Sequence, residues 1–192
     1  MTARPQLLIY GSRSYARTVQ DLALDLGWSV AGFIDDQFTG TGVVGTLAIA
    51  TREFAPDRHA LALGIGYDDL PGRWSAWCRV RQAGWQLPSL VHPRAYVART
   101  ATLGPGCVVM AGAVVDRAAA LGEAVVVWPG ACINHNVVVG SNSFVSPNAT
   151  LCGGARVGMH VFIGAGALLV DHAEVPESSF VKMGARHTIR QP

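Results

Sequence analysis

The sequence has no apolar segment near its N-terminus long enough for a membrane anchor or a secretory signal. The apolar run from Leu7 to Tyr10 stops at Gly11, whereas a membrane-spanning helix needs about 20 apolar residues. Charge is also scarce: charged residues make up 15% of the chain, the net charge is +2, and Lys and Arg form no block. We therefore expect a cytoplasmic protein that has no membrane span and binds neither nucleic acid nor anionic membranes.

Two common fingerprints are missing as well. The four cysteines, Cys78, Cys107, Cys132 and Cys152, form no CxxC pair, which favours reduced thiols that pack as small apolar side chains. Of the GxGxxG pattern of dinucleotide-binding enzymes, only Gly11 remains after the first expected strand. Because no residues for hydride chemistry are in view, a bound nucleotide would serve as a handle on a substrate and not as a redox cofactor.

The second half of the sequence consists of a six-residue repeat. Every sixth residue from Val91 to Val181 is aliphatic, and the residue four places after each of them is Ala, Ser, Cys or Val. A glycine also recurs every eighteen residues, at Gly104, Gly122, Gly140 and Gly158. This second period indicates three hexapeptides per coil and a corner whose backbone conformation disfavours a Cβ atom. The pattern predicts a parallel β-helix with aliphatic side chains along its axis.

Residues 1–90 predict a smaller domain that precedes the β-helix of residues 91–192. We expect strands at 6–10, 29–34 and 60–65, helices at 15–26 and 71–82, and a loop around Gly40, Gly42 and Gly45. On the second helix, Trp74, Trp77, Cys78 and Arg81 are spaced for one face. The order strand, glycine loop, helix, strand and acidic pair is that of an α/β, Rossmann-like nucleotide-binding unit.

Candidate nucleotide contacts follow from this order. Asp35 and Asp36 stand where an acidic residue holds a ribose or base edge in such units. Arg13, together with backbone amides at the start of the helix, could meet a diphosphate.

Three histidines lie on the predicted β-helix. His135 is the third residue of its hexapeptide and points outward near a corner, where an imidazole, with a reference pKa of about 6.5, can act as a general base. His160 and His172 are interpreted as surface residues. His135 and His172 are two coils apart, about 10 Å at the usual strand spacing, and His160 is on another face. A zinc site within one chain is therefore not expected, whereas one shared between subunits stays open.

Several segments together are typical of one family: Leu7-Leu8-Ile9-Tyr10-Gly11, Gly32-Phe33-Ile34-Asp35-Asp36, Gly64-Ile65-Gly66, Leu90-Val91-His92-Pro93, Ile133-Asn134-His135 and Phe162-Ile163-Gly164-Ala165-Gly166-Ala167. In these segments the chain resembles the two-domain hexapeptide sugar acetyltransferases of the NeuD/PglD type, which acetylate sialic acid or a nucleotide-linked amino sugar. The resemblance covers nearly the whole chain. It implies an α/β Rossmann-like domain followed by a left-handed β-helix.

The resemblance also implies a catalytic site without a metal. In such a site His135 is the general base, the backbone N–H of Gly153 is the oxyanion donor, and Phe144 and Ala165 belong to the acetyl-CoA pocket. Acetyl-CoA is expected between adjacent β-helices of a homotrimer. The nucleotide-linked sugar is expected on the N-terminal domain, at Gly11, Arg13, Ser14, Tyr15, Asp35, Asp36 and Gly66.

Four positions depart from the family pattern. Asn136 replaces the Glu or Asp that usually follows the histidine, and Phe144 replaces a histidine that contacts acetyl-CoA in some members. Arg13-Ser14-Tyr15 stands where Gly-Gly-His is frequent, and the sequence from Lys182 to Arg186 replaces a usual Gly-x-Pro-Ala ending.

The function favoured by these observations is acetyl-CoA-dependent N-acetylation of a nucleotide-linked amino deoxysugar in a surface-polysaccharide or glycan pathway. O-acetylation of sialic acid or a related sugar uses the same base and thioester, and so remains an alternative. Asn136 and Phe144 also leave open a non-catalytic trimeric binding or scaffold protein. A metal-dependent hydratase is the least favoured alternative.

Overall fold

The computed structural model describes residues 5–56 and 58–188. The chain divides into two compact units, residues 1–90 and residues 91–192, and each is described by itself. Within the described ranges, no helix is both long enough and apolar enough to cross a membrane.

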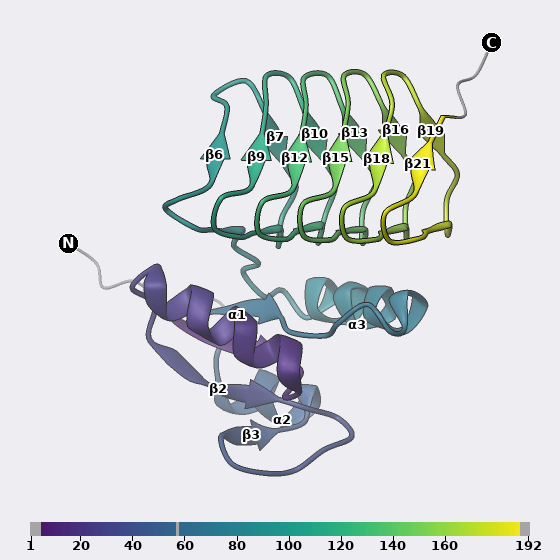
Figure 1. Ribbon diagram of the computed structural model, residues 1–192. Helices are drawn as coiled ribbons and strands as arrows, with labels where there is room; N and C mark the ends of the chain where they lie inside the picture. Colours follow the sequence, from purple (N-terminus) through teal and green to yellow (C-terminus); the bar gives the residue numbers. More distant parts are fainter. Residues whose placement is uncertain (1–4, 57, 189–192) are drawn as a thin grey trace. The chain divides into compact units, whose positions relative to one another are not determined.

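The first unit contains a four-stranded parallel sheet and three helices (Figure 1). Its elements in chain order are β1 (Gln6–Tyr10), α1 (Ser14–Asp25), β2 (Val30–Ile34), β3 (Val43–Gly45), α2 (Leu47–Glu53), β4 (His59–Leu63) and α3 (Leu70–Gln82). The strand order is β3-β2-β1-β4, and all three pairings are parallel. Leu7, Leu8 and Ile9 of the central strand β1 are fully buried, as expected for a parallel strand whose two faces are both covered. The predicted α/β domain is confirmed.

The expected loop around Gly40, Gly42 and Gly45 is in part regular structure. It contains the short strand β3 and the helix α2, so the strand expected at 60–65 is the fourth strand and not the third. Gly42, just before β3, and Gly45, the last residue of β3, adopt positive φ angles of 83° and 138°. A strand of three residues is too short to show an alternating pattern. Thr46 then caps α2, because its Oγ1 accepts a hydrogen bond from the N–H of Ile49 at 3.4 Å.

The buried face of α3 coincides only in part with the face on which Trp74, Trp77, Cys78 and Arg81 are spaced. Arg73, Ala76, Trp77 and Val80 are buried, whereas Trp74 and Cys78 are half-buried and Arg81 is exposed. Arg73 is inside because its Nε donates a hydrogen bond to the carbonyl oxygen of Ile65 at 2.9 Å. A pattern based on apolar spacing does not count a buried arginine, so the sequence did not predict this buried face.

The second unit is a parallel β-helix of two-residue strands that recur every six residues (Figure 1). The strands are β5 (Leu90–Val91), β6 (Tyr96–Val97), β7 (Thr102–Leu103), β8 (Val108–Val109), β9 (Val114–Val115), β10 (Ala120–Leu121), β11 (Val126–Val127), β12 (Cys132–Ile133), β13 (Val138–Val139), β14 (Phe144–Val145), β15 (Thr150–Leu151), β16 (Arg156–Val157), β17 (Phe162–Ile163), β18 (Leu168–Leu169), β19 (Glu174–Val175), β20 (Phe180–Val181) and β21 (Arg186–His187). Every third strand joins the same sheet, which gives three parallel sheets. Residues therefore pair with those eighteen positions away, as Ile133 does with Leu151.

The axis of the β-helix is filled as the repeat predicts. The aliphatic and the small residues of successive hexapeptides form one buried core, which includes Val115, Ala131, Ile133, Ala149 and Leu151. The last strand, β21, lies one hexapeptide beyond Val181. At the core position of this strand His187 replaces the aliphatic residue, and its Nε2 lies 2.8 Å from the carbonyl oxygen of Glu174.

The eighteen-residue glycine period has a different cause from the one expected. Gly104, Gly122, Gly140 and Gly158 are not among the residues with positive φ. A Cβ atom on any of them would lie within 2.5 to 2.7 Å of the backbone of the next coil, so glycine is required there by close packing between coils. The positive φ angles occur at another position of the repeat: Gly106, Gly112, Ala118, Ala124, Gly130, Asn136, Asn142, Asn148, Gly154, His160, Gly166, His172, Ser178 and Gly184.

Candidate active site

His135 lies in the turn between β12 and β13, where two of the three sheets meet. The turn is stacked between its neighbours along the β-helix: the N–H of Asn136 donates to the carbonyl oxygen of Arg117, and the N–H of Gly154 donates to that of His135, both at 3.0 Å. Asn136 has a φ of 59°, a conformation that Asn adopts more readily than most residues. The backbone of His135 is therefore fixed on both sides, while its side chain is exposed.

The imidazole of His135 lies against Gly153, one coil further along. A Cβ atom on Gly153 would lie 2.5 Å from Cε1 and 2.8 Å from Nε2 of the ring, closer than such atoms can approach. The ring thus uses the space that the missing side chain leaves. The structure brings together the two residues that the sequence predicted as base and oxyanion donor.

The other ring nitrogen of His135 faces Asn136. The side-chain amide nitrogen of Asn136 lies 3.2 Å from Nδ1. In this arrangement the amide donates to Nδ1, and the proton of a neutral ring is on Nε2. A half-turn of the amide would present its oxygen to Nδ1 and leave the lone pair of Nε2 free, because an amide can donate or accept where a carboxylate only accepts.

The backbone N–H of Gly153 has no acceptor within residues 5–56 and 58–188. The corresponding residues of several other turns also have a backbone N–H without an acceptor, so this free donor alone does not identify a site. Its distinguishing feature is the imidazole of His135 beside it.

Phe144 and Ala165, the predicted acetyl-CoA residues, lie elsewhere on the β-helix. Phe144 is in β14, which belongs to the sheet β20-β17-β14-β11-β8-β5. The turn of His135 joins strands of the other two sheets, and Ala165 follows β17 at a different corner. One chain therefore does not gather these two residues around His135.

Two thiols lie on the sheet next to this turn. Burial raises the pKa of Cys132, and the charges of Asp116 and Cys152 raise it further. Burial and the charge of Asp171 likewise raise the pKa of Cys152. Both thiols are therefore poor nucleophiles near neutral pH.

In the first unit, the predicted nucleotide residues gather at the carboxyl ends of β1, β2 and β4. The chain passes from β1 to β2 on one side and later returns to β4 on the other, so β1 and β4 flank the point where the strand order reverses, the usual ligand position in such sheets. Gly11, with a φ of 116°, packs there against the backbone of Gly64. Gly66 lies close to Tyr15 of α1, and Ser14 is the first residue of that helix.

Asp35 holds the β1 and β2 loops together. Its Oδ2 accepts a hydrogen bond from Ser12 Oγ at 2.6 Å, and its Oδ1 accepts from the N–H groups of Gln37 and Phe38. Burial alone raises the pKa of Asp35, but these hydrogen bonds outweigh it and hold the pKa below its ordinary value. Arg13 lies over the ring of Phe38, 4.1 Å from the ring centroid.

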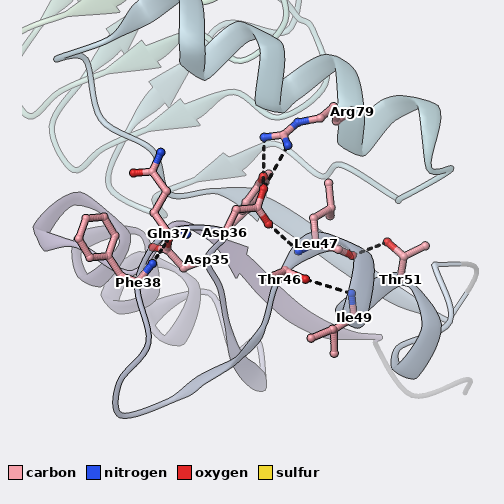
Figure 2. A network of polar contacts seen from close by, with 10 residues as sticks. Asp35, Asp36, Gln37, Phe38, Thr46, Leu47, Ile49, Thr51 and Arg79 are labelled. Atoms are coloured by element: carbon pink, nitrogen blue, oxygen red, sulfur yellow. Dashed lines mark hydrogen bonds and ion pairs between the residues drawn. The ribbon is translucent and has the colours of Figure 1, made fainter.

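Asp36 is the centre of a polar network that the sequence analysis did not predict (Figure 2). Its carboxylate accepts hydrogen bonds from the Tyr10 hydroxyl and from the N–H of Leu47, and pairs with Arg79 at 3.1 Å. Arg79 also donates to the Tyr10 hydroxyl at 2.7 Å. Burial, and then the hydrogen bond to Asp36, raise the pKa of Tyr10. The network links residues in or next to β1, β2, α2 and α3. Because these residues are far apart in the sequence, no local sequence pattern predicts the network.

The described parts of the chain contain no cluster of metal-ligating side chains. Within them, no three His, Cys, Asp or Glu side chains are grouped so that they could hold an ion.

Comparison with known proteins identifies both units. Residues 6–70 match the family model of the PglD N-terminal domain, and residues 136–171 match that of the bacterial transferase hexapeptide, six repeats. Among curated protein sequences no match was found.

Solved structures match over almost the whole chain. The acetyltransferase domain of PglB from Neisseria gonorrhoeae is 28% identical, with 98% of this chain and 93% of that chain covered and a TM-score of 0.90. The same domain in complex with acetyl coenzyme A is 26% identical over 96% of each chain, with a TM-score of 0.79. A histidine-to-asparagine mutant of perosamine N-acetyltransferase from Caulobacter crescentus, in complex with CoA and GDP-perosamine, is 27% identical over 94% of each chain, with a TM-score of 0.76.

The two units thus match the two parts of one kind of enzyme, in the same order along the chain. A PglD N-terminal domain followed by a hexapeptide β-helix is the organisation of the two-domain hexapeptide-repeat sugar acetyltransferases of the NeuD/PglD type, and the chain is similar to this type in both units.

Proposed function

We propose that this protein transfers the acetyl group of acetyl-CoA to the amino group of a nucleotide-linked amino deoxysugar, with His135 as the general base. The contact between the His135 ring and Gly153 carries the proposal, because it sets a base beside a free backbone N–H on an exposed corner. The complexes of similar enzymes with acetyl coenzyme A and with CoA and GDP-perosamine support the donor and the acceptor class.

The chemistry is a direct acyl transfer. The lone pair of the acceptor amine forms a bond to the thioester carbonyl carbon, and the carbonyl electrons move to oxygen, where the N–H of Gly153 donates a hydrogen bond to the oxyanion. His135 Nε2 takes a proton from the nitrogen. The C=O bond then re-forms, the C–S bond breaks, and the thiolate of coenzyme A leaves and takes up the proton. The raised pKa values of Cys132 and Cys152 argue against an acyl-cysteine intermediate.

Asn136 has a positioning role in this mechanism. His135 can accept a proton at Nε2 only when Nδ1 carries the ring proton, and that tautomer requires the amide oxygen of Asn136 to face Nδ1. The half-turn of the Asn136 amide is therefore part of the proposal. A neutral amide stabilises this tautomer less strongly than a carboxylate would.

The acceptor is proposed to bind through its nucleotide at the carboxyl ends of β1 and β4. Gly11, Ser14, Tyr15 and Gly66 lie there, and α1 begins with backbone N–H groups suited to a diphosphate. Asp35 and Asp36 are engaged in hydrogen bonds within the protein, so in this proposal they shape the loops that receive the nucleotide.

Assembly as a homotrimer completes the proposed acetyl-CoA site. Phe144 and Ala165 are away from His135 within one chain. Phe144 is fully buried in its own chain, so a second β-helix alongside the first would supply only the half-buried Ala165 from its surface. A cytoplasmic location and a role in polysaccharide or glycan synthesis belong to the same proposal. The four free cysteines fit a reducing compartment.

The test is release of coenzyme A from acetyl-CoA in the presence of UDP-, dTDP- and GDP-linked amino sugars and of free sialic acid. We expect release with one nucleotide-linked amino sugar and a loss of at least about a hundredfold in kcat for His135→Ala. Release with sialic acid alone would instead identify an O-acetyltransferase. Release at the native rate by His135→Ala would contradict the assignment of the base.

A further inference from the structure

A second histidine lies against the same turn as His135, from the opposite side. His172 is 37 residues after His135, which is two coils of eighteen and one further residue, and its N–H donates to the carbonyl oxygen of Gly153 at 2.9 Å. A Cβ atom on Gly154 would lie 2.5 Å from Nδ1 and 2.7 Å from Cε1 of the His172 ring. The His172 ring therefore leans back over Gly154, as the His135 ring leans forward over Gly153.

The two glycines thus separate two imidazoles that lie on one corner of the β-helix. A side chain on Gly153 would displace the first ring, and a side chain on Gly154 would displace the second. Simple stacking at the strand spacing puts the backbones of His135 and His172 about 10 Å apart. Both rings lie against the intervening turn, one at Gly153 and the other at Gly154.

The side chain of His172 is not engaged elsewhere in the described part of the chain. His135 is bound to Asn136, and His160, which has the same positive φ at a different corner, lies 2.8 Å from the buried amide of Asn142. His172 is exposed and makes no hydrogen bond with its ring within residues 5–56 and 58–188. Its Nδ1 edge faces Gly154, and Nε2 is not among the ring atoms nearest to that residue.

We propose that His172 is a further catalytic residue, whose Nε2–H donates a second hydrogen bond to the acetyl carbonyl oxygen beside the N–H of Gly153. This inference rests on the proposed function. An oxyanion is stabilised by donors that are already in place when charge develops, and sites of this kind commonly use two. Gly153 supplies one donor, and the ring of His172, which lies against the adjacent Gly154 from the next coil, supplies the other. His172 neither gains nor loses a proton in the reaction, so the proton transfers described for His135 and coenzyme A stay the same.

The test compares two replacements that imitate different ring nitrogens. In His172→Gln the amide nitrogen reaches the position of Nε2, whereas in His172→Asn it reaches only that of Nδ1. We expect His172→Gln to keep kcat within about threefold of native. We expect His172→Asn to lower kcat by about a hundredfold, as loss of an oxyanion donor does, with KM for acetyl-CoA within about twofold of native in both variants.

His160→Asn is the matched control, because it makes the same replacement at the same backbone conformation on another corner. It should keep the native kcat, and all three variants should keep the native melting temperature. Equal kcat values for the Gln and Asn variants of His172, a change confined to KM, or an equal loss in His160→Asn would overturn the inference. If His135→Ala abolishes release while His172→Asn does not, the proposed function stands and this inference falls. No release by the native protein would end both.

Discussion

The imidazole of His135 occupies the space beside Gly153 in which any other residue would place its Cβ atom. The φ angle of Gly153 is not in the left-handed region, so the backbone there would accept another residue. Glycine is required at this position by the ring and not by the turn. Replacing Gly153 should therefore change activity without changing the stability of the fold.

Gly153→Ala should therefore lower activity while leaving stability nearly unchanged. The new methyl group would push the exposed His135 ring aside, and a displacement of about 1 Å can cost about a hundredfold in rate. We expect kcat for coenzyme A release to fall by about ten- to a hundredfold, with a melting temperature close to native.

A double-mutant cycle identifies the cause of that loss. In the His135→Ala background, Gly153→Ala should have almost no further effect, because the ring it displaces is already absent. Fully additive losses would mean that Gly153 acts independently of the ring.

Asn136→Asp should move the pH dependence of the reaction. A carboxylate next to Nδ1 stabilises the protonated imidazole and fixes the proton on Nδ1 of the neutral ring. The base is active only when deprotonated, so the acid limb of the kcat/KM profile should move up by about one pH unit, and kcat above that limb should rise.

Asn148→Asp is the control for this experiment. Asn148 is an exposed turn residue with a φ of 57°, similar to the 59° of Asn136, and it makes no contact with His135. Its profile should match that of the native protein. An equal shift in both variants would attribute the change to the net charge of the surface and not to the contact with Nδ1.

The sequence was most informative where one interaction is repeated many times. An aliphatic residue every sixth position predicts the β-helix, because each coil buries its residue against the same position of the next coil, as Ile133 does against Leu151. The contact between His135 and Gly153 follows from the same repeat, since Gly153 comes one coil of eighteen residues after His135. Identifying His135 as the base still required the family resemblance.

Interactions that occur only once were missed. Tyr10 is in β1, Asp36 follows β2 and Arg79 is in α3, so no local pattern predicts their contact. Likewise, the contact of the His172 ring with Gly154 depends on the conformation of the side chain. From the sequence, His172 was interpreted only as a surface residue. The glycine at every eighteenth position is visible in the sequence, but the reason predicted for it was wrong, because the approach of the next coil is visible only in three dimensions.

Asp35 gives a prediction about stability and pH in the first unit. Its pKa lies below the ordinary value of 3.8 in the folded protein, since hydrogen bonds from Ser12, Gln37 and Phe38 favour the ionised form over the effect of burial. The stability that ionised Asp35 contributes is therefore fully present above about pH 4 and is lost as the pH falls through the folded pKa. Asp35→Asn should lower the free energy of unfolding at pH 7 by about 1 kcal/mol, a value reduced by the partial exposure of the group.

Denaturant unfolding followed by tryptophan fluorescence measures this difference, because four of the five tryptophans, Trp28, Trp74, Trp77 and Trp85, lie in the first unit and only Trp128 lies in the second. The difference in the free energy of unfolding between the native protein and Asp35→Asn should become steadily smaller below pH 4, because the carboxyl group of Asp35 becomes protonated and loses its charge. Asp68→Asn provides the control: Asp68 is exposed and makes no hydrogen bond within the described residues, so its removal should change stability little at any pH. A gap for Asp35→Asn that stays constant from pH 7 to pH 3 would show that its hydrogen bonds do not depend on the charge.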